Sequence, residues 1–256
     1  MLLQSKRVLI TGGATGIGRA AVKRCSKEGD QVVFGDINSK DGTALAYSLN
    51  EDGASVSFLE TDVSNLDSSS NLVDTAYKLM GGIDCLLTAA AVARGALIPI
   101  DEFPDEEWLK HLNVNLTGTY YIAKRVAKVM KENDGGVMLL IASGAGITGP
   151  SSILPYGATK GGVNGLGMTL EQQLECNNIR VNVLCPGNIK TPLKLGIINE
   201  QVEKIGRRAQ RDVQLSALGK SDGVSLFYRV SAFRSSRLRK RKYIRSIELQ
   251  VLRKCV

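Results

Sequence analysis

Short apolar segments alternate with longer stretches along this chain. Six of the short segments have the apolar, β-branched character of buried strands, namely residues 7–11, 31–35, 55–59, 84–88, 136–143 and 180–184. Between them apolar residues recur at helical spacing, as in the series Trp108, Leu112, Tyr120, Ile122, Val126 and Met130. Repeated strand and helix units predict an α/β fold, a doubly wound parallel sheet with helices on both faces in a single domain. A ligand is then expected at the carboxyl ends of the strands.

The length and composition fit one buried core. The chain has 256 residues, of which 43% are hydrophobic, and this is too short for two full domains. The first strand begins at residue 7, which leaves no room for an export signal. The apolar run at 137–142 is far shorter than a membrane span. We therefore expect a soluble, cytoplasmic protein.

Cysteine and histidine give no metal-site pattern. Five cysteines (Cys25, Cys85, Cys176, Cys185 and Cys255) are scattered without a close pair, so we expect reduced thiols. The single histidine, His111, has no partner at metal-ligand spacing. A solvated helix residue is the expected state of His111.

The net charge of +8 is confined to the end of the chain. Residues 221–256 contain ten Lys or Arg and two Asp or Glu, whereas the other 220 residues contain 23 of each sign. An argument for nucleic-acid or membrane binding would therefore concern only this tail. The run 237–245, flanked by Tyr228 and Tyr243, could make such a contact, but basic runs are more often solvated, and no nucleic-acid partner is expected.

A glycine-rich loop follows the first strand. It reads Thr-Gly-Gly-Ala-Thr-Gly-Ile-Gly at 11–18 and leads into a helical pattern. Gly12 and Gly16 allow the backbone to turn close to a pyrophosphate, Gly18 allows close helix packing, and Thr15 and Ile17 complete the loop. The alternative is a flexible turn without a ligand.

Two carboxylates end the next two strands. Asp36 follows the second strand, where a carboxylate can accept hydrogen bonds from the adenosine ribose and would repel a 2′-phosphate, so NAD is favoured over NADP. Arg19 and Lys40 are the nearby cations that could reach a 2′-phosphate and so offset the preference for NAD. Asp62, followed by Val63, ends the third strand and could bind the adenine amino group, or could cap a helix instead.

Tyr156 and Lys160 stand four residues apart in Tyr-Gly-Ala-Thr-Lys, with Ser143 thirteen residues upstream. Residues at i and i+4 share a helix face, so an ammonium group would lie beside a phenol. The ammonium would favour the ionised phenol, whose pKa is ordinarily near 10, and make it usable as a general acid and base. The same helix contains Gly157, Gly161, Gly162, Gly165 and Gly167. This number of glycines predicts close packing within the subunit or against a second copy, unless the helix is simply weak.

With these motifs the chain resembles the short-chain dehydrogenase/reductase family over roughly residues 6–225. The resemblance also covers Asn-Val-Asn-Leu-Thr-Gly at 113–118 and the segment with Pro186, Gly187 and Thr191 after the sixth strand. It implies a Rossmann-like domain over 1–224 and NAD-dependent interconversion of a secondary alcohol and a ketone in a homodimer or homotetramer. Tyr156 would exchange the proton, Ser143 would donate to the substrate oxygen, and Lys160 would assist. Asn115 would hold a water beside Lys160, or would serve only to kink its helix. The walls of the nicotinamide site would include Pro186, Gly187, Ile189 and Thr191.

The chain departs from the family pattern in two places. Thr88-Ala-Ala-Ala stands where the family usually has Asn-Asn-Ala-Gly, leaving Thr88 to supply one hydroxyl to the cofactor. Residues 225–256 diverge into a basic segment, either disordered or an edge strand in which Ile247, Leu249 and Val251 alternate. Two other functions stay open: a cofactor-binding protein with impaired catalysis, and an NADPH-dependent 3-oxoacyl reductase. The substrate itself cannot be read from residues 192–211.

Overall fold

A computed structural model describes residues 6–205, 215, 218–221 and 244–245. The strands are β1 (Arg7–Thr11), β2 (Gln31–Asp36), β3 (Ser55–Glu60), β4 (Cys85–Thr88), β5 (Gly136–Ile141), β6 (Ile179–Cys185) and β7 (Ile244–Arg245). They form one sheet in the order β3-β2-β1-β4-β5-β6-β7, with every neighbouring pair parallel. The predicted α/β fold and doubly wound parallel sheet are confirmed.

The helices between the strands are α1 (Gly16–Lys27), α2 (Ser39–Glu51), α3 (Leu66–Met80), α4 (Asp105–His111), α5 (Gly118–Glu132), α6 (Leu154–Leu174) and α7 (Pro192–Ile205). Short 3-10 helices cover Ile100–Glu102 and Glu175–Asn177, and a π-helical segment, Leu112–Thr117, joins α4 to α5. Chain order jumps between the adjacent strands β1 and β4. This is the switch point at which a doubly wound sheet opens a ligand crevice.

The core has two layers because neighbouring strand residues point to opposite faces of the sheet. Val8 and Ile10 of β1 pack with α1 and α2, whereas Leu9 between them packs with α3, α5 and α6. A parallel sheet is buried on both faces, which explains why β1, β2, β4 and β5 contain continuous apolar runs, whereas β3 and β6 carry polar residues at alternate positions.

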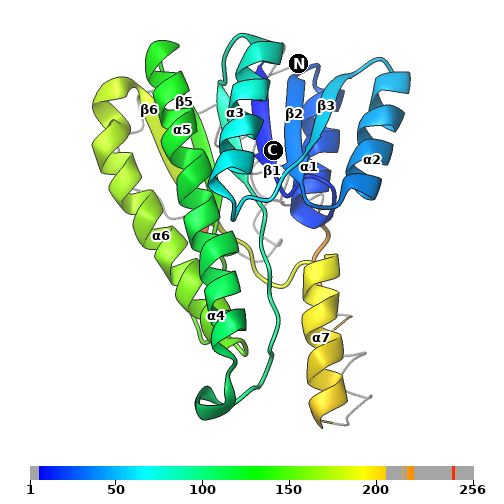
Figure 1. The fold of residues 1–256 in the computed structure, drawn as a ribbon, viewed down its shortest axis with the longest axis vertical. Helices are drawn as coiled ribbons and strands as arrows, with labels where there is room; N and C mark the ends of the chain where they lie inside the picture. Colours follow the sequence, from blue (N-terminus) through cyan, green and yellow to red (C-terminus); the bar gives the residue numbers. More distant parts are fainter. Residues whose placement is uncertain (1–5, 206–214, 216–217, 222–243, 246–256) are drawn as a thin grey trace, which may run out of the picture.

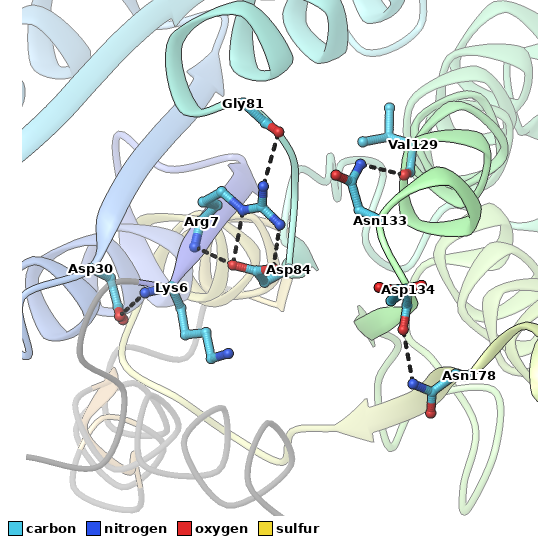
Figure 2. A network of polar contacts seen from close by, with 9 residues as sticks. All are labelled: Lys6, Arg7, Asp30, Gly81, Asp84, Val129, Asn133, Asp134 and Asn178. Carbon is cyan, nitrogen blue, oxygen red and sulfur yellow. Dashed lines mark hydrogen bonds and ion pairs between the residues drawn. The ribbon is translucent and has the colours of Figure 1, made fainter.

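A polar network ties together the amino ends of the strands (Figure 2). The Arg7 guanidinium donates to both carboxylate oxygens of Asp84 at 2.7 and 3.1 Å and to the Gly81 carbonyl at 2.9 Å. Burial pushes the pKa of Asp84 up, but the hydrogen bonds and charge of Arg7 hold that pKa below its usual 3.8. The network lies at the end of the sheet opposite to the expected crevice, so it stabilises the fold without entering the site.

Four of the five glycines of α6 lie close to other parts of the chain. A Cβ at Gly167 would overlap Val183 of β6, one at Gly162 would lie 2.9 Å from Leu116, one at Gly157 would lie 2.9 Å from Ser151, and one at Gly161 would lie 3.2 Å from the Gly146 carbonyl. Close packing within the subunit therefore accounts for them. Gly165 faces open space.

The expectation of a divergent tail falls mostly outside the described residues. Within them, β7 pairs Ile244 with Leu184 and Arg245 with Cys185. The described residues do not include Tyr228, Tyr243, Ile247, Leu249, Val251 or Cys255. Of the basic run 237–245 they include only residues 244 and 245.

Candidate active site

A cavity of about 790 Å³ lies at the carboxyl ends of the strands. Its wall is built from the segments that follow β1 to β6, completed by Tyr156 and Lys160 of α6 and by the first turns of α7. The chain after β4 runs between α4 and α7, which project from this end of the molecule (Figure 1). The crevice thus lies where the strand order predicts it.

The glycine loop forms one wall of the cavity. Gly12 and Gly16 have φ values of +70° and +54°, which side chains strongly disfavour. A Cβ at Gly12 would lie 2.5 Å from the Ala90 nitrogen, and one at Gly18 would overlap the Gly12 carbonyl oxygen. The amino end of α1, whose cap Thr15 makes no side-chain hydrogen bond, faces this wall. The absent side chains and the open helix end fit a pyrophosphate.

Asp36 ends β2 beside this loop. One carboxylate oxygen accepts from the Ala14 amide at 2.9 Å and the other from the Asn38 amide at 2.9 Å. Arg19 donates to the Ala14 carbonyl at 3.1 Å, and neither Arg19 nor Lys40 lines the cavity. Asp36 therefore has a turn-forming role and also lines the cavity, where its negative charge is available to ribose hydroxyls.

Asp62 and Val63 line the same end of the cavity. The Oδ1 atom of Asp62 accepts from the amide and hydroxyl of Ser64 at 2.9 and 2.6 Å, and the Asp62 amide donates to the Ser68 hydroxyl at 3.0 Å. Asp62 thus shapes the turn before α3, but it does not cap the helix: the cap is Asn65, whose side chain accepts from the Ser68 amide at 2.9 Å. The place of Asp62 in the cavity wall fits the other expected role, contact with an adenine amino group.

Ser143, Tyr156 and Lys160 meet at the centre of the cavity wall. The Lys160 Nζ atom lies 5.7 Å from the centroid of the Tyr156 ring and donates to the Ile141 carbonyl at 2.8 Å. Ser143 follows β5, and its hydroxyl shares a hydrogen bond with that of Tyr156. A phenol, a hydroxyl and an amine on one surface can exchange a proton with a bound oxygen and stabilise charge on it.

Burial controls the proton affinities of this group. It raises the pKa of Tyr156 above its usual 10.0, against a smaller lowering by the Ser143 hydrogen bond. It also lowers the pKa of Lys160 to about 8. The shift of the Tyr156 pKa is thus opposite to the expected lowering by Lys160, because desolvation of the buried phenol is its largest cause.

Asn115 is fully buried in the π-helical segment and does not line the cavity. Its amide oxygen accepts from the Val92 amide at 2.8 Å, and its nitrogen donates to the Val92 carbonyl at 3.0 Å and to the Thr159 hydroxyl at 3.2 Å. A local widening of a helix is often found at functional sites. Here it allows one side chain to fix the loop after β4 to the residue beside Lys160.

Comparison with known families decides the identity. The family model described as short chain dehydrogenase matches residues 6–201, which include the glycine loop and the Ser143, Tyr156 and Lys160 group. The chain belongs to the short-chain dehydrogenase family.

Characterised relatives and solved structures cover most of this dehydrogenase. An L-rhamnose 1-dehydrogenase (NAD(P)(+)) of Azotobacter vinelandii is 33% identical, over 88% of each chain. A 3-alpha-(or 20-beta)-hydroxysteroid dehydrogenase of Mycobacterium bovis is 33% identical, over 84% of this chain and 81% of the relative. The crystal structure of an actinorhodin polyketide ketoreductase with NADPH superposes with a TM-score of 0.80 at 28% identity, covering 91% and 92% of the two chains.

The expectation for His111 is wrong. Instead of being solvated, it is fully buried at the end of α4 in this dehydrogenase. Its Nδ1 lies 2.7 Å from the Glu107 carbonyl, and its Nε2 accepts from the Arg94 amide at 3.2 Å. One ring nitrogen must therefore carry the hydrogen that faces Glu107, and the other must be bare. With Asn115, one turn further along, His111 anchors the loop after β4.

Thr88 is not among the residues that line the cavity. It is buried at the end of β4, where its hydroxyl has no hydrogen-bond partner. The next three residues, Ala89, Ala90 and Ala91, do line the cavity. The segment therefore presents Ala89, Ala90 and Ala91 to a ligand, whereas Thr88, expected to supply a hydroxyl to the cofactor, does not line the cavity.

The far wall follows β6 and includes Pro186, Gly187, Ile189 and Thr191. A set of contacts that no sequence motif indicates holds α7 in place. The Glu200 carboxylate accepts from the Gly95 and Ala96 amides at 3.1 and 3.0 Å, and Lys204 donates to the Ala96 carbonyl at 2.7 Å. We call these three hydrogen bonds the α7 latch. It fixes α7 against the loop that Asn115 and His111 hold from the other side.

Within the described part of the chain, no group of three or more His, Cys, Asp or Glu side chains could hold a metal ion. In that same part, none of the helices combines the length and apolar character needed to cross a bilayer.

Proposed function

We propose that this dehydrogenase interconverts a secondary alcohol and a ketone with NAD(H), and that Tyr156 is the general acid and base. The observation that carries the proposal is the layout of one cavity. A phosphate-binding loop and a ribose-facing carboxylate occupy one end, and Ser143, Tyr156 and Lys160 meet on the same wall. A bound nicotinamide would supply or accept the hydride.

The protein groups handle the proton and the charge on oxygen. In reduction, Tyr156 gives its proton to the substrate oxygen while Ser143 donates a hydrogen bond to that oxygen. In oxidation the proton of the alcohol returns to the tyrosinate. Burial raises the pKa of the Tyr156 phenol above its usual 10.0, so the phenol keeps its proton at neutral pH. Oxidation of the alcohol releases a proton and is therefore favoured as pH rises. Lys160, 5.7 Å from the centroid of the Tyr156 ring, is a cation that can stabilise tyrosinate only below its own pKa of about 8.

We assign the residue roles as follows. The catalytic residues are Tyr156, Lys160 and Ser143, with Asn115 supporting them from behind the wall. The cofactor contacts are Gly12, Thr15, Gly16, Ile17, Gly18, Asp36, Asp62, Val63, Pro186, Gly187, Ile189 and Thr191, all of which line the cavity together with Tyr156 and Lys160.

NAD is favoured over NADP because Asp36 would face a 2′-phosphate. The lysines that line the cavity are Lys110, Lys160 and Lys194, and no arginine of the described residues lines it. The ketoreductase solved with NADPH supports the rival, an NADPH-dependent 3-oxoacyl reductase. Titration with NADH and with NADPH separates the two, because the carboxylate of Asp36 should weaken NADPH binding by at least about tenfold.

The decisive experiment replaces Tyr156 with phenylalanine. NADH should bind with unchanged affinity, and turnover of a panel of ketones and alcohols should fall by at least about a thousandfold, because the transferred proton has no donor. Tyr47→Phe is the matched control, since this exposed tyrosine lies on α2 outside the cavity. NADH binding without turnover in the unchanged protein would instead indicate a cofactor-binding protein with impaired catalysis.

We further propose a homodimer or homotetramer and a cytoplasmic location. Tyr120 of α5 and Met168 of α6 are 43% and 46% exposed on helices that lie side by side, which suits contact with a second copy (Figure 1). Among the described residues, Cys25, Cys85, Cys176 and Cys185 form no disulfide, which suits a reducing compartment. Light scattering of the purified protein tests the assembly. Gly165→Leu, on the open face of α6, tests whether that face forms it.

A further inference from the structure

The cavity has an uneven distribution of charge. Its carboxylates, among the described residues, are Asp36, which ends β2 and bonds to the glycine loop at Ala14, and Asp62, which follows β3. Beyond Tyr156 the charged groups that line it are Lys194 of α7 and Lys110 at the end of α4. The half expected to hold the substrate thus carries positive charge.

Lys194 faces this half from the first turn of α7. It lines the cavity together with Ile197 and Gln201, at positions i, i+3 and i+7 of one helix face. The preceding residue, Leu193, packs in a cluster with Tyr156, Ile153 and Ile197. The ammonium is therefore carried by a helix face that extends from the reacting hydroxyl away from the glycine loop.

No carboxylate neutralises this ammonium within the described residues. The residues three and four positions from Lys194 are Ile197 and Ile198 within α7 and Thr191 and Lys190 just before it, and none of them is acidic. Glu200 is occupied by the Gly95 and Ala96 amides of the α7 latch. Lys194 is half-buried, and desolvation alone lowers its pKa. A half-buried cation without a counter-ion is costly, and an anionic ligand offsets that cost.

The rest of this half is apolar. Val92, Ile153, Leu193 and Ile197 line it, and Gln201 adds a neutral polar group. From this arrangement we propose that the substrate is an oxo or hydroxy acid with an apolar body, whose carboxylate pairs with Lys194 while its reacting oxygen meets Tyr156 and Ser143. The proposal rests on the function proposed above and specifies its substrate class.

The anion that pairs with Lys194 could have a second source, the pyrophosphate of the cofactor. Thr191 lies against the glycine loop, since a Cβ at Gly16 would be 3.2 Å from its Cγ2 atom. We favour the substrate because the helix face of Lys194, Ile197 and Gln201 continues along α7, whereas the loop amides and the amino end of α1 already serve the pyrophosphate. Cofactor affinity separates the two sources.

The test compares a keto acid, 3-benzoylpropionate, with its neutral methyl ester. The unchanged enzyme should reduce the acid with a kcat/KM at least about tenfold above that of the ester, since a desolvated charge pair adds binding that the ester lacks. Lys194→Met should remove the preference by raising KM for the acid, with the ester and the NADH affinity unaffected. Lys194→Arg should retain it. Lys190→Met is the matched control, because it removes the same charge from an exposed site outside the cavity.

A binding measurement keeps the two proposals distinguishable. Calorimetry with 4-phenylbutanoate and its amide, in the presence of NADH, reports acid recognition without any turnover. If the unchanged protein binds the acid more tightly than the amide and Lys194→Met abolishes this difference, the substrate-class proposal is supported, even when neither ketone is reduced. Failure to reduce the ketones counts only against the proposed reaction. Equal binding of acid and amide overturns the substrate-class proposal. So does a Lys194→Met variant that loses NADH affinity and still prefers the acid, since Lys194 would then serve the pyrophosphate.

Discussion

At the scale of single residues, the glycines of this dehydrogenase differ sharply in what they allow. Gly18 has no room for a side chain because a Cβ there would overlap the Gly12 carbonyl oxygen. A Cβ at Gly165, in contrast, would have no neighbouring atom within 4 Å. Gly18→Ala should lower the free energy of unfolding by about 2 kcal/mol or more and abolish NADH binding. Gly165→Ala should raise that free energy by up to about 1 kcal/mol. Denaturant titration and NADH titration measure both, and equal effects of the two changes would refute the packing argument.

Residue roles that depend on short spacing can be predicted from the sequence, and those that depend on distant partners cannot. Tyr156 and Lys160 share a helix face, so four residues of spacing suffice to place them together. The burial of His111 is not predictable, because its partner, the Arg94 amide, lies on a loop whose path no local pattern reveals. The contact from Glu200 to Gly95 spans 105 positions and is hidden for the same reason.

At the scale of elements, the pair formed by Arg7 and Asp84 joins the start of β1 to the residue before β4 (Figure 2). Asp84→Asn should lower the free energy of unfolding at pH 7 by about 1 kcal/mol, because the pair is only partly buried. The folded pKa of Asp84 is depressed, so its contribution is present above the usual pKa of 3.8 and is lost as pH falls through the lower folded value.

The difference between the Asp84→Asn variant and the unchanged protein should therefore narrow below about pH 3.8 in urea titrations. Asp134→Asn is the control, since Asp134 is exposed and only its carbonyl is used, by Asn178. A difference that stays constant with pH would show that Asp84 contributes through its shape and not through its charge.

The six main strands are predictable as elements because β1, β2, β4 and β5 are short continuous apolar runs that a parallel sheet buries on both faces, whereas β3 and β6 alternate apolar and polar residues. Their ends shift by no more than two residues from the expected ones. The π-helical turn at Leu112–Thr117 is not predictable from helical periodicity, since its Asn115 bonds to Val92 and Thr159, which lie 23 and 44 positions away in the chain.

At the scale of the whole molecule, the buried amine of Lys160 serves the proposed catalysis but lowers the stability of the fold. Its folded pKa of about 8 lies below the usual 10.5, so the buried ammonium destabilises the fold below pH 8, and stability should rise with pH between about 8 and 10.5. Lys160→Met should raise the free energy of unfolding at pH 7 by about 1 to 2 kcal/mol, after the loss of the Ile141 hydrogen bond is counted, and should abolish turnover.

That advantage should shrink as the pH approaches 10, because the unchanged protein no longer buries a charge there. Lys128→Met, at an exposed position of α5, should leave the free energy of unfolding and its pH dependence unchanged. Denaturation curves at several pH values measure the free energy of unfolding of Lys160→Met and of the unchanged protein. If the stability difference in favour of Lys160→Met grows with pH, the ammonium does not destabilise the fold.

The pairing of β1 with β2 has a consequence for how such a chain can vary. Thr11 stands opposite Gly35, and the Gly12 amide donates to the Gly35 carbonyl, so the glycine loop and Asp36 leave the sheet at the same level. Main-chain register thereby fixes the spacing between the pyrophosphate and ribose subsites that we propose. Insertions in the turns at the amino ends of the strands would leave that spacing unchanged, whereas one residue added within β1 or β2 would move one subsite relative to the other.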